Sequence, residues 1–404
     1  MSFHSLTPAV PGAGGSGAAL PGRDRVVDAA RAGSILVVVL WHWALSVTHR
    51  NPQGELVMPN PLHTVPGGWL ATWVLQVVPV FFLVGGYANL AAWTSAHRRG
   101  ESVRGFVTRR MRRLLLPFAL WLWCWVAVEV AVLAFAGSRG HDVVWQWFPG
   151  LVAPLWFLGL YAVLTALTPV TAELHRRHGA ASVAVLVALI ALGGVLDRVV
   201  GAPGAAWVVA GLVWVFCHQL GYLWRSTDLG HRALPVRAGV ALAGFAGLAA
   251  LTTAGGYPRS MVAEVGATSN MLPTTPSIAA LAVAQLGLLA VVTPLAARVL
   301  QVRAVWLPIV LVNLVAVSLL VWHMTAYAVT VLAVEALGGQ LLAEPTAAWW
   351  ADRWFWVMAP AAVLALILVV VAIPACGDDE GAVETRIVGD TLTVYSSLPL
   401  QGPL

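Results

Sequence analysis

The chain contains no lysine and has few charged residues of any kind. All 23 basic residues in the 404-residue sequence are arginines, and charged residues make up only 10% of the total. Soluble domains carry roughly 25% charged residues, so this composition excludes an ordinary globular protein that folds in water. The formal net charge is +5, but the arginines stand in loops between apolar runs, where they orient a membrane protein. The excess of basic residues therefore does not predict nucleic-acid binding.

Cysteine is also scarce. Of the three cysteines, Cys124 and Cys217 fall inside apolar runs and Cys376 stands where the last run ends. This excludes a disulfide framework and favours small buried residues or free thiols. Residues 1–25 are rich in glycine, proline and alanine and lack the apolar segment of a signal peptide, so we expect a flexible cytosolic tail. Residues 375–404 are expected to form a second cytosolic tail, which leaves residues 26–374 as one transmembrane domain.

Apolar runs are what the sequence has in abundance. Hydrophobic residues make up 59% of the chain and the mean hydropathy is +0.81. A helix needs about 20 consecutive apolar residues to cross the hydrocarbon core. The run at 305–334 is long enough to tilt or break. The sequence therefore predicts an all-α polytopic membrane protein with about ten transmembrane helices, at residues 26–47, 68–93, 114–136, 151–172, 181–201, 205–224, 238–255, 277–297, 305–334 and 354–374.

The arginines predict how these spans are oriented. If the N-terminus is cytosolic, 17 arginines fall in inside segments and 5 in outside segments, while Arg31 lies within the first span. Cytosolic loops of membrane proteins carry the excess of basic residues. We therefore expect a multi-pass protein of the cell membrane with both termini inside. Matching Gly/Pro-broken spans in two halves, which are typical of many secondary transporters, are not evident.

The first span carries three ionisable side chains on one helix face. Asp28 and Arg31 are spaced i,i+3 and can pair, and His42 follows Arg31 by eleven residues, which is three turns and about 20°. At 1.5 Å per residue, about 16 Å separate Arg31 from His42, so His42 is near the midplane if Arg31 lies at the interface. An ionisable side chain at that depth usually has a functional role. The alternative is a neutral histidine that hydrogen-bonds between helices.

An arginine cluster precedes the third span. Guanidinium groups on one helix face suit bidentate contact with phosphate oxygens, although arginines at this position also fix topology and touch lipid phosphates. Both interpretations stay open for the four members of the cluster, Arg109, Arg110, Arg112 and Arg113.

Three further polar residues lie within predicted spans. Glu129 is about 18 Å into the third span, at a depth comparable to that of His42, and either orients the imidazole or is an outer-leaflet carboxylate. His323 lies mid-span and either belongs to a site or makes a structural hydrogen bond. His218 approaches the cytosolic end of its span, where we expect a structural role.

Together these segments resemble the acyltransferase family 3 of membrane O-acyltransferases, whose members also have ten spans with both ends inside. The matching motifs occur in family order from residue 26 to about residue 330. One departure concerns an acidic run that many members carry after their LWFL motif, because Gly159, Leu160 and Tyr161 stand there in this chain. The matching segments are Arg31 with His42, PVFFLVGGYANLAAW (79–93, with Gly85 and Gly86), Arg110-Met-Arg-Arg113 followed by Leu-Leu-Leu-Pro117, PLWFLGLYAVLTALTPV (154–170) and SLLVWHMTAYAV (318–329).

The resemblance implies an enzyme that moves an acyl group from cytosolic acyl-CoA to a hydroxyl group. His42 would be the general base or a transient acyl carrier, supported by Arg31, Asp28 and Glu129. The arginine cluster would bind the polyanionic coenzyme A. Acetyl-CoA is the default donor, no metal is expected, and the acceptor is a carbohydrate, a glycolipid or a secondary metabolite. Residues that would line the pocket or contact the acceptor are His323, Trp156 and Tyr161.

Two rival functions remain at this point. A proton-coupled transporter or flippase for a lipid-linked or hydrophobic solute would use Arg31 and His42 as a gate. A non-enzymatic membrane partner would gain nothing from its costly buried charges. A His42→Ala substitution distinguishes the acyltransferase from the transporter, because only the enzyme loses acyl transfer.

Overall fold

The computed structural model describes residues 24–262, 269–375, 385–388 and 391–394, and it confirms an all-α polytopic protein. The predicted tails at 1–25 and 375–404, and Cys376, lie almost wholly outside the described residues. Two short antiparallel hairpins pair β1 (His49–Arg50) with β2 (Leu56–Val57) and β3 (Thr385–Val388) with β4 (Thr391–Val394). The helices are α1 (Arg25–Ala44), α2 (Gly68–Leu75), α3 (Val78–Arg98), α4 (Val103–Val152), α5 (Trp156–Ala166), α6 (Thr168–His178), α7 (Ala180–Val195), α8 (Ala205–Thr227), α9 (Leu234–Thr253), α10 (Pro276–Val299), α11 (Arg303–Leu314), α12 (Ala316–Ala336), α13 (Ala347–Ala351) and α14 (Phe355–Ala375).

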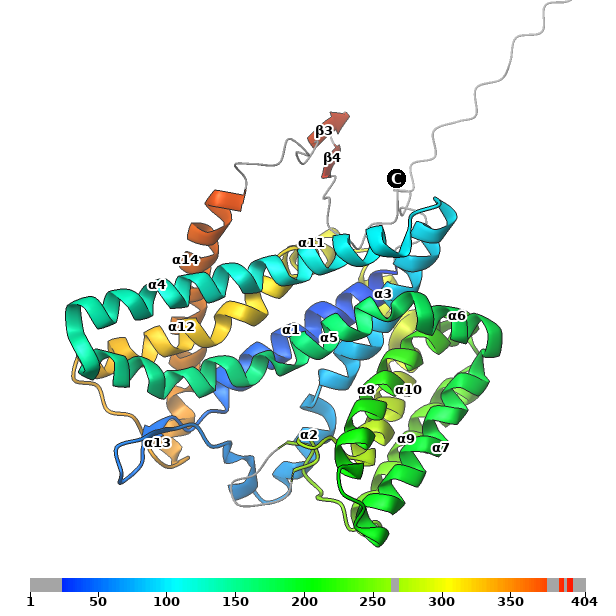
Figure 1. Cartoon of the computed structure of the whole chain (residues 1–404), viewed down its shortest axis with the longest axis horizontal. Coiled ribbons are helices and arrows are strands. Elements are labelled where there is room, and N and C mark those ends of the chain that lie inside the picture. The colour runs from blue at the N-terminus through cyan, green and yellow to red at the C-terminus, as the bar shows by residue number, and fades with distance from the viewer. Residues whose placement is uncertain (1–23, 263–268, 376–384, 389–390, 395–404) are drawn as a thin grey trace, which may run out of the picture.

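Nine segments of the described chain are long and apolar enough to cross a membrane. One of them, Val103–Ala166, is 64 residues long and contains the third predicted span and most of the fourth, whose last residues continue into α6. The helical backbone breaks at Gly137, where φ is 61° and ψ is −155°, and the chain turns back on itself there (Figure 1). Counting the two arms of this hairpin separately accounts for the expected number of about ten.

The long predicted span at 305–334 is broken, as its length indicated. The break lies at Val315, between the 12-residue helix α11 and the 21-residue helix α12. Because a helix that ends inside an apolar region leaves backbone groups without helical partners, nearby polar side chains are expected to compensate. Asn313, in the last turn of α11, is buried at this break.

Helix α1 lies in the middle of the molecule (Figure 1). It begins at a capped end, since the Asp24 carboxylate accepts hydrogen bonds from the backbone amides of Val26 and Val27. On one side α1 packs against α12 and α14, and α12 packs against the α4 hairpin; on the other side α1 packs against α3, which in turn contacts α8 and α10. Two groups of buried apolar side chains fill these two halves.

Two glycines allow α3 and α8 to touch backbone to backbone. A Cβ atom at Gly86 would lie 2.0 Å from the carbonyl oxygen of His218, and one at Gly221 would lie 2.0 Å from the carbonyl oxygen of Leu83. Small residues at such contacts are typical of helix pairs in membranes. The close contact brings Asn89 of α3 beside His218 of α8.

Candidate active site

The site centres on two histidines that face each other from α1 and α12. His42 Nδ1 lies 3.0 Å from His323 Nε2, and the two rings stack with centroids 5.0 Å apart. His323 Nδ1 lies 2.9 Å from the carbonyl oxygen of Leu320. The sequence places these histidines 281 residues apart, and no spacing rule predicts that they form a pair.

The Leu320 carbonyl determines which nitrogens carry protons. A carbonyl oxygen only accepts hydrogen bonds, so His323 Nδ1 must carry the proton and donate it, and in the neutral ring His323 Nε2 then accepts. His42 Nδ1 is therefore the donor to His323 Nε2. In a neutral imidazole this leaves the lone pair on His42 Nε2, which is the state that a general base requires.

Neighbouring contacts hold the pair in register. The indole nitrogen of Trp43 donates to the His323 carbonyl oxygen at 3.0 Å, and the hydroxyls of Thr48 and Tyr327 lie 2.7 Å apart. His323 is completely buried, with 0% of its surface exposed. These contacts and the pairing of the rings join the end of α1, and the segment that follows it, to the middle of α12, and they fix the relative position of the two imidazoles.

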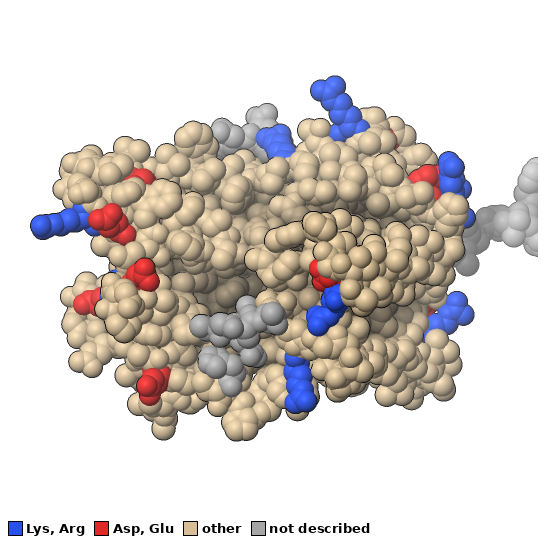
Figure 2. All heavy atoms as spheres, turned by 60° about the horizontal axis from the view of Figure 1, so that its bottom comes forward, with Lys and Arg blue, Asp and Glu red and all other residues tan. Residues whose placement is uncertain are grey.

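His42 also lines a cavity of about 520 Å³. Trp41 and Trp156 line the same cavity, as do the polar side chains of Asn60 and Gln76. It lies at the end of the bundle formed by α2, the β1–β2 hairpin and α13, and that face of the molecule is hollowed near its centre (Figure 2). The structure thus places the predicted pocket residue Trp156 with His42.

Tyr161, the other aromatic residue predicted at the pocket, is not among the described residues that line this cavity. Its ring packs against Phe81 and Phe82, and a Cβ atom at Gly85 would lie 2.4 Å from it. Tyr161 therefore fills the space that Gly85 leaves open on α3, and its ring packs between α5 and α3.

Arg31 is held by Asp28 and by Asn313, a residue that is not predicted from the sequence. Arg31 lies 3.2 Å from the Asp28 carboxylate and donates at 2.7 Å to the side-chain oxygen of Asn313. Asn313 in turn donates to the backbone carbonyls of Asp28 and Ile309 at 3.0 and 2.9 Å. The helix break after α11 therefore anchors the ion pair of α1. An asparagine just before a break in a long apolar run was the signal available in the sequence.

A second buried polar network surrounds Arg110. Its guanidinium donates at 3.2 Å to the side-chain oxygen of Asn89, and the Asn89 amide nitrogen lies 3.1 Å from both Thr165 Oγ1 and His218 Nε2. All four residues are buried. Neither Asn89 nor Thr165 is predicted as a site residue from the sequence, and His218 is buried in the bundle, where it makes a structural hydrogen bond.

The four predicted phosphate-binding arginines have different surroundings. Arg109 is bound to the Glu101 carboxylate at 2.7 Å, and its hydrogen bonds lower the pKa of Glu101. Arg112 is exposed and Arg113 is partly buried. The positive charges of Arg31, Arg109 and Arg113 all act on the buried Arg110. Among the four, Arg110 is the member built into the interior.

Glu129 does not contact the histidine pair in this structure. Its carboxylate is hydrogen-bonded to His141, from the other arm of the α4 hairpin. The partner that orients His42 is His323 instead. Within the described residues, no group of three or more His, Cys, Asp or Glu side chains is arranged to hold a metal ion.

A comparison with models of protein families identifies the family of this chain. The model of the family described as "Acyltransferase domain" matches residues 24–376, which include every helix from α1 to α14, the histidine pair and both arginine networks. No curated protein and no solved structure matches the chain.

Proposed function

Since this chain belongs to the acyltransferase family whose domain model matches residues 24–376, we propose that it transfers an acyl group from acyl-CoA to a hydroxyl group of an acceptor. The family and the apolar helices support a membrane acyltransferase. Acetyl-CoA as donor, and a carbohydrate, glycolipid or secondary metabolite as acceptor, belong to the proposal, as does a location in the cell membrane.

The observation that carries the proposal is the hydrogen bond from His42 Nδ1 to His323 Nε2. It leaves the lone pair of His42 Nε2 to take the proton from an acceptor hydroxyl in the cavity. The hydroxyl oxygen then attacks the thioester carbonyl, the carbon–sulfur bond breaks, and the thiolate of coenzyme A receives the proton from His42. Atoms and charge balance without another reactant.

His323 has a positioning role in this scheme. When His42 takes up a proton it becomes an imidazolium, and its Nδ1–H bond to a neutral acceptor strengthens as charge develops. His323 accepts that hydrogen bond from a fixed position, because its own proton is bound by the Leu320 carbonyl. The same lone pair on His42 also suits direct attack on the thioester to give an acyl-histidine, so both routes use the same pair.

The arginine networks support a donor that is a polyanion. Arg110 is buried against the neutral Asn89 amide, and Arg31 adds a second guanidinium whose charge acts on it. Phosphate oxygens bind strongly to guanidinium groups in such settings. Along α1, Arg31 lies about 16 Å from His42, a separation that the uncharged pantetheine arm of coenzyme A would bridge.

The acceptor would reach His42 from the other side of the bundle. The cavity of about 520 Å³ is within the size range of small-molecule sites. Trp41 and Trp156 offer flat apolar surfaces, and Asn60 and Gln76 offer polar groups. This combination suits a sugar ring or a polyhydroxylated metabolite.

The test compares ester content in cells that produce the wild-type protein, His42→Ala or His141→Ala. The His141 variant is the matched control, because His141 lies on the α4 hairpin and is paired with Glu129. Mass spectrometry of base-released acetate from surface glycans and extracted metabolites should show ester loss in His42→Ala alone. If His42→Ala retains the ester, the proposal is wrong; transport of an unmodified solute by the wild type without ester formation would favour the transporter.

A further inference from the structure

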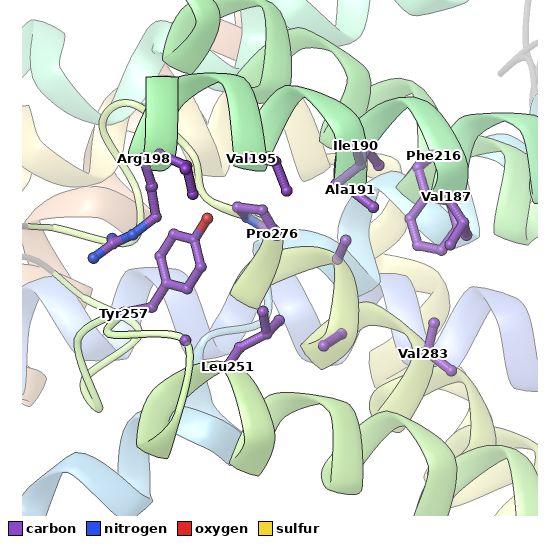
Figure 3. Close-up of a pocket in the computed structure, with 15 residues that line it drawn as sticks. Val187, Ile190, Ala191, Val195, Arg198, Phe216, Leu251, Tyr257, Pro276 and Val283 are labelled. Carbon is purple, nitrogen blue, oxygen red and sulfur yellow. The ribbon is translucent and has the colours of Figure 1, made fainter. Parts of the chain in front are cut away.

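A second cavity lies in the other half of the bundle, away from the histidine pair. It has a volume of about 610 Å³ and is lined by residues of α7, α8, α9 and α10. Figure 3 shows the side chains of Val187 and Phe216 at one end and those of Arg198 and Tyr257 at the other. The proposed acyl transfer uses none of these residues.

The length of this cavity matches one leaflet of a bilayer. Val187 and Arg198 both belong to the segment that crosses the membrane at 180–200. Eleven helical residues separate them, which corresponds to about 16 Å. The hydrocarbon core of a bilayer is about 30 Å thick, so half of it is about 15 Å. The cavity therefore has the depth of a single acyl chain, with its polar end at the level of the lipid headgroups.

The polar end is built around one cation. Arg198 donates at 3.0 Å to the Gly256 carbonyl oxygen, and its guanidinium carbon lies 4.4 Å from the centre of the Tyr257 ring. Arg198 belongs to a π-helical turn, Leu196–Val200, and is exposed. A guanidinium has five N–H donors in a fork that fits phosphate, and Arg198 is the only charged residue among those lining this cavity in the described chain.

We infer that this cavity is a binding site for an anionic phospholipid, with one acyl chain inserted between α7, α9 and α10 and the phosphate bound by Arg198. The apolar lining binds the chain by burial, and the charge of Arg198 selects an anionic headgroup over a zwitterionic one. Tyr257 keeps the guanidinium at the mouth of the cavity. The occupant is a bilayer lipid, not the substrate of the histidine site.

The test is lipid retention measured by native mass spectrometry. The purified full-length protein in detergent is mixed with equal amounts of dioleoyl phosphatidylglycerol and dioleoyl phosphatidylcholine. A hydrogen bond to a charged group contributes about 1.5–3 kcal/mol, so the wild type should retain phosphatidylglycerol at least about tenfold over phosphatidylcholine. Arg198→Gln should bring this ratio close to about one.

Two further variants complete the test. Arg259→Gln is the matched control, because Arg259 is exposed, stacks on Trp69 and does not line the cavity; it should keep the wild-type ratio. Ala191→Phe fills the cavity from α7 and should remove both bound lipids. The inference is overturned if Arg198→Gln keeps the preference, if Ala191→Phe retains lipid like the wild type, or if the wild type is a lipid-free dimer whose second copy covers the cavity.

Discussion

At the scale of single residues, the proton positions on two imidazoles decide what the site can do. His323 is buried, with one nitrogen on the Leu320 carbonyl and the other on His42. An unpaired ring nitrogen in that place would lower the free energy of unfolding by about 1–3 kcal/mol. A leucine at position 323 would leave His42 without its partner, whereas glutamine retains an oxygen that accepts from His42 Nδ1. This difference separates a positioning role from simple packing.

Arg110 and Arg112 make a matched pair for testing the donor site, because one is buried and the other exposed on the same helix. Arg110→Gln should raise the KM for acyl-CoA by about 10- to 100-fold, since one or more charged hydrogen bonds to phosphate are lost. The kcat should change by less than about threefold, because binding and not chemistry is affected. Steady-state kinetics of the purified protein measures both values. An equal rise in KM for Arg112→Gln would contradict a special role for Arg110.

His175 gives the stability of the protein a pH dependence. Its side chain is buried in α6, with Nε2 at 3.0 Å from Ser226 Oγ, and burial lowers the pKa of its imidazole below the ordinary value of 6.5. Below pH 6.5 the unfolded chain therefore binds more protons than the folded protein. The stability that His175 contributes is present above pH 6.5 and is lost as the pH falls toward the folded-state pKa.

Thermal melting in detergent between about pH 7.5 and pH 5 measures this effect. The melting temperature of the wild type should fall more over this range than that of His175→Gln, in which the amide can still bond Ser226. His178→Gln is the control, because His178 is exposed on the same helix, and should follow the wild type. Identical pH profiles for His175→Gln and the wild type would show that His175 does not titrate in this range.

At the scale of elements, the most informative features are the places where helices break or touch. The break at Val315 divides the run at 305–334, which the apolar pattern predicts as one span, and the reversal at Gly137 separates the third predicted span from the fourth. The break at Val315 also supplies Asn313, which binds Arg31. The apolar pattern predicted the existence of the spans well, because length and hydropathy determine them. It did not predict which helix faces meet.

The glycine contact between α3 and α8 yields a prediction about stability. Gly221→Ala places a methyl group 2.0 Å from the Leu83 carbonyl oxygen, which should destabilise the protein by about 1–3 kcal/mol through overpacking. Gly211 lies on the same helix, and a Cβ atom there meets nothing within 4 Å. Gly211→Ala should leave the protein unchanged or stabilise it by up to about 1 kcal/mol. Melting temperatures in one detergent compare the two; equal values would show that the α3–α8 contact can relax.

At the scale of the whole molecule, the two polar sites lie toward opposite ends of the bundle. The Arg110 network belongs to the first half of α4, and the His42 cavity is lined by loops at the other end. The arginine distribution predicts that the first end faces the cytosol, which would give acyl-CoA and the acceptor separate routes to His42. The orientation remains a prediction from the sequence.

Cysteine labelling tests this orientation. In a variant whose three natural cysteines are replaced by alanine, Gln53→Cys in the exposed β1–β2 turn should react with a membrane-impermeant maleimide added to intact cells. Arg104→Cys, exposed near the start of α4, should react only after the cells are permeabilised. Reaction of Arg104→Cys in intact cells, with protection of Gln53→Cys, would show the reverse orientation.

The sequence draws attention to individual ionisable residues within the spans but not to their partners. His42, Arg31, Asp28 and Arg110 stand out because an ionisable group in an apolar run is costly and rarely accidental. The pairing of His42 with His323 depends on the tertiary packing of α1 against α12, so spacing along the chain carries no signal for it. Tertiary packing also decides the partner of Glu129. Its depth in the membrane is predicted to be comparable to that of His42, which suggested that the two residues meet. The hairpin at Gly137 instead brings Glu129 to His141.

The central claim is that His42, positioned by His323, is the group that acts on the substrates. Its most direct test is the rate of coenzyme A release from acetyl-CoA by purified protein in lipid nanodiscs supplied with envelope extract as acceptor. Removal of a general base lowers the rate about 10²- to 10⁴-fold, so His42→Ala should lower kcat by at least about 100-fold. His323→Leu should lower kcat by about 10- to 100-fold, and His323→Gln should lower it less than His323→Leu does. A His42→Ala protein that releases coenzyme A and forms ester at the wild-type rate would contradict the claim.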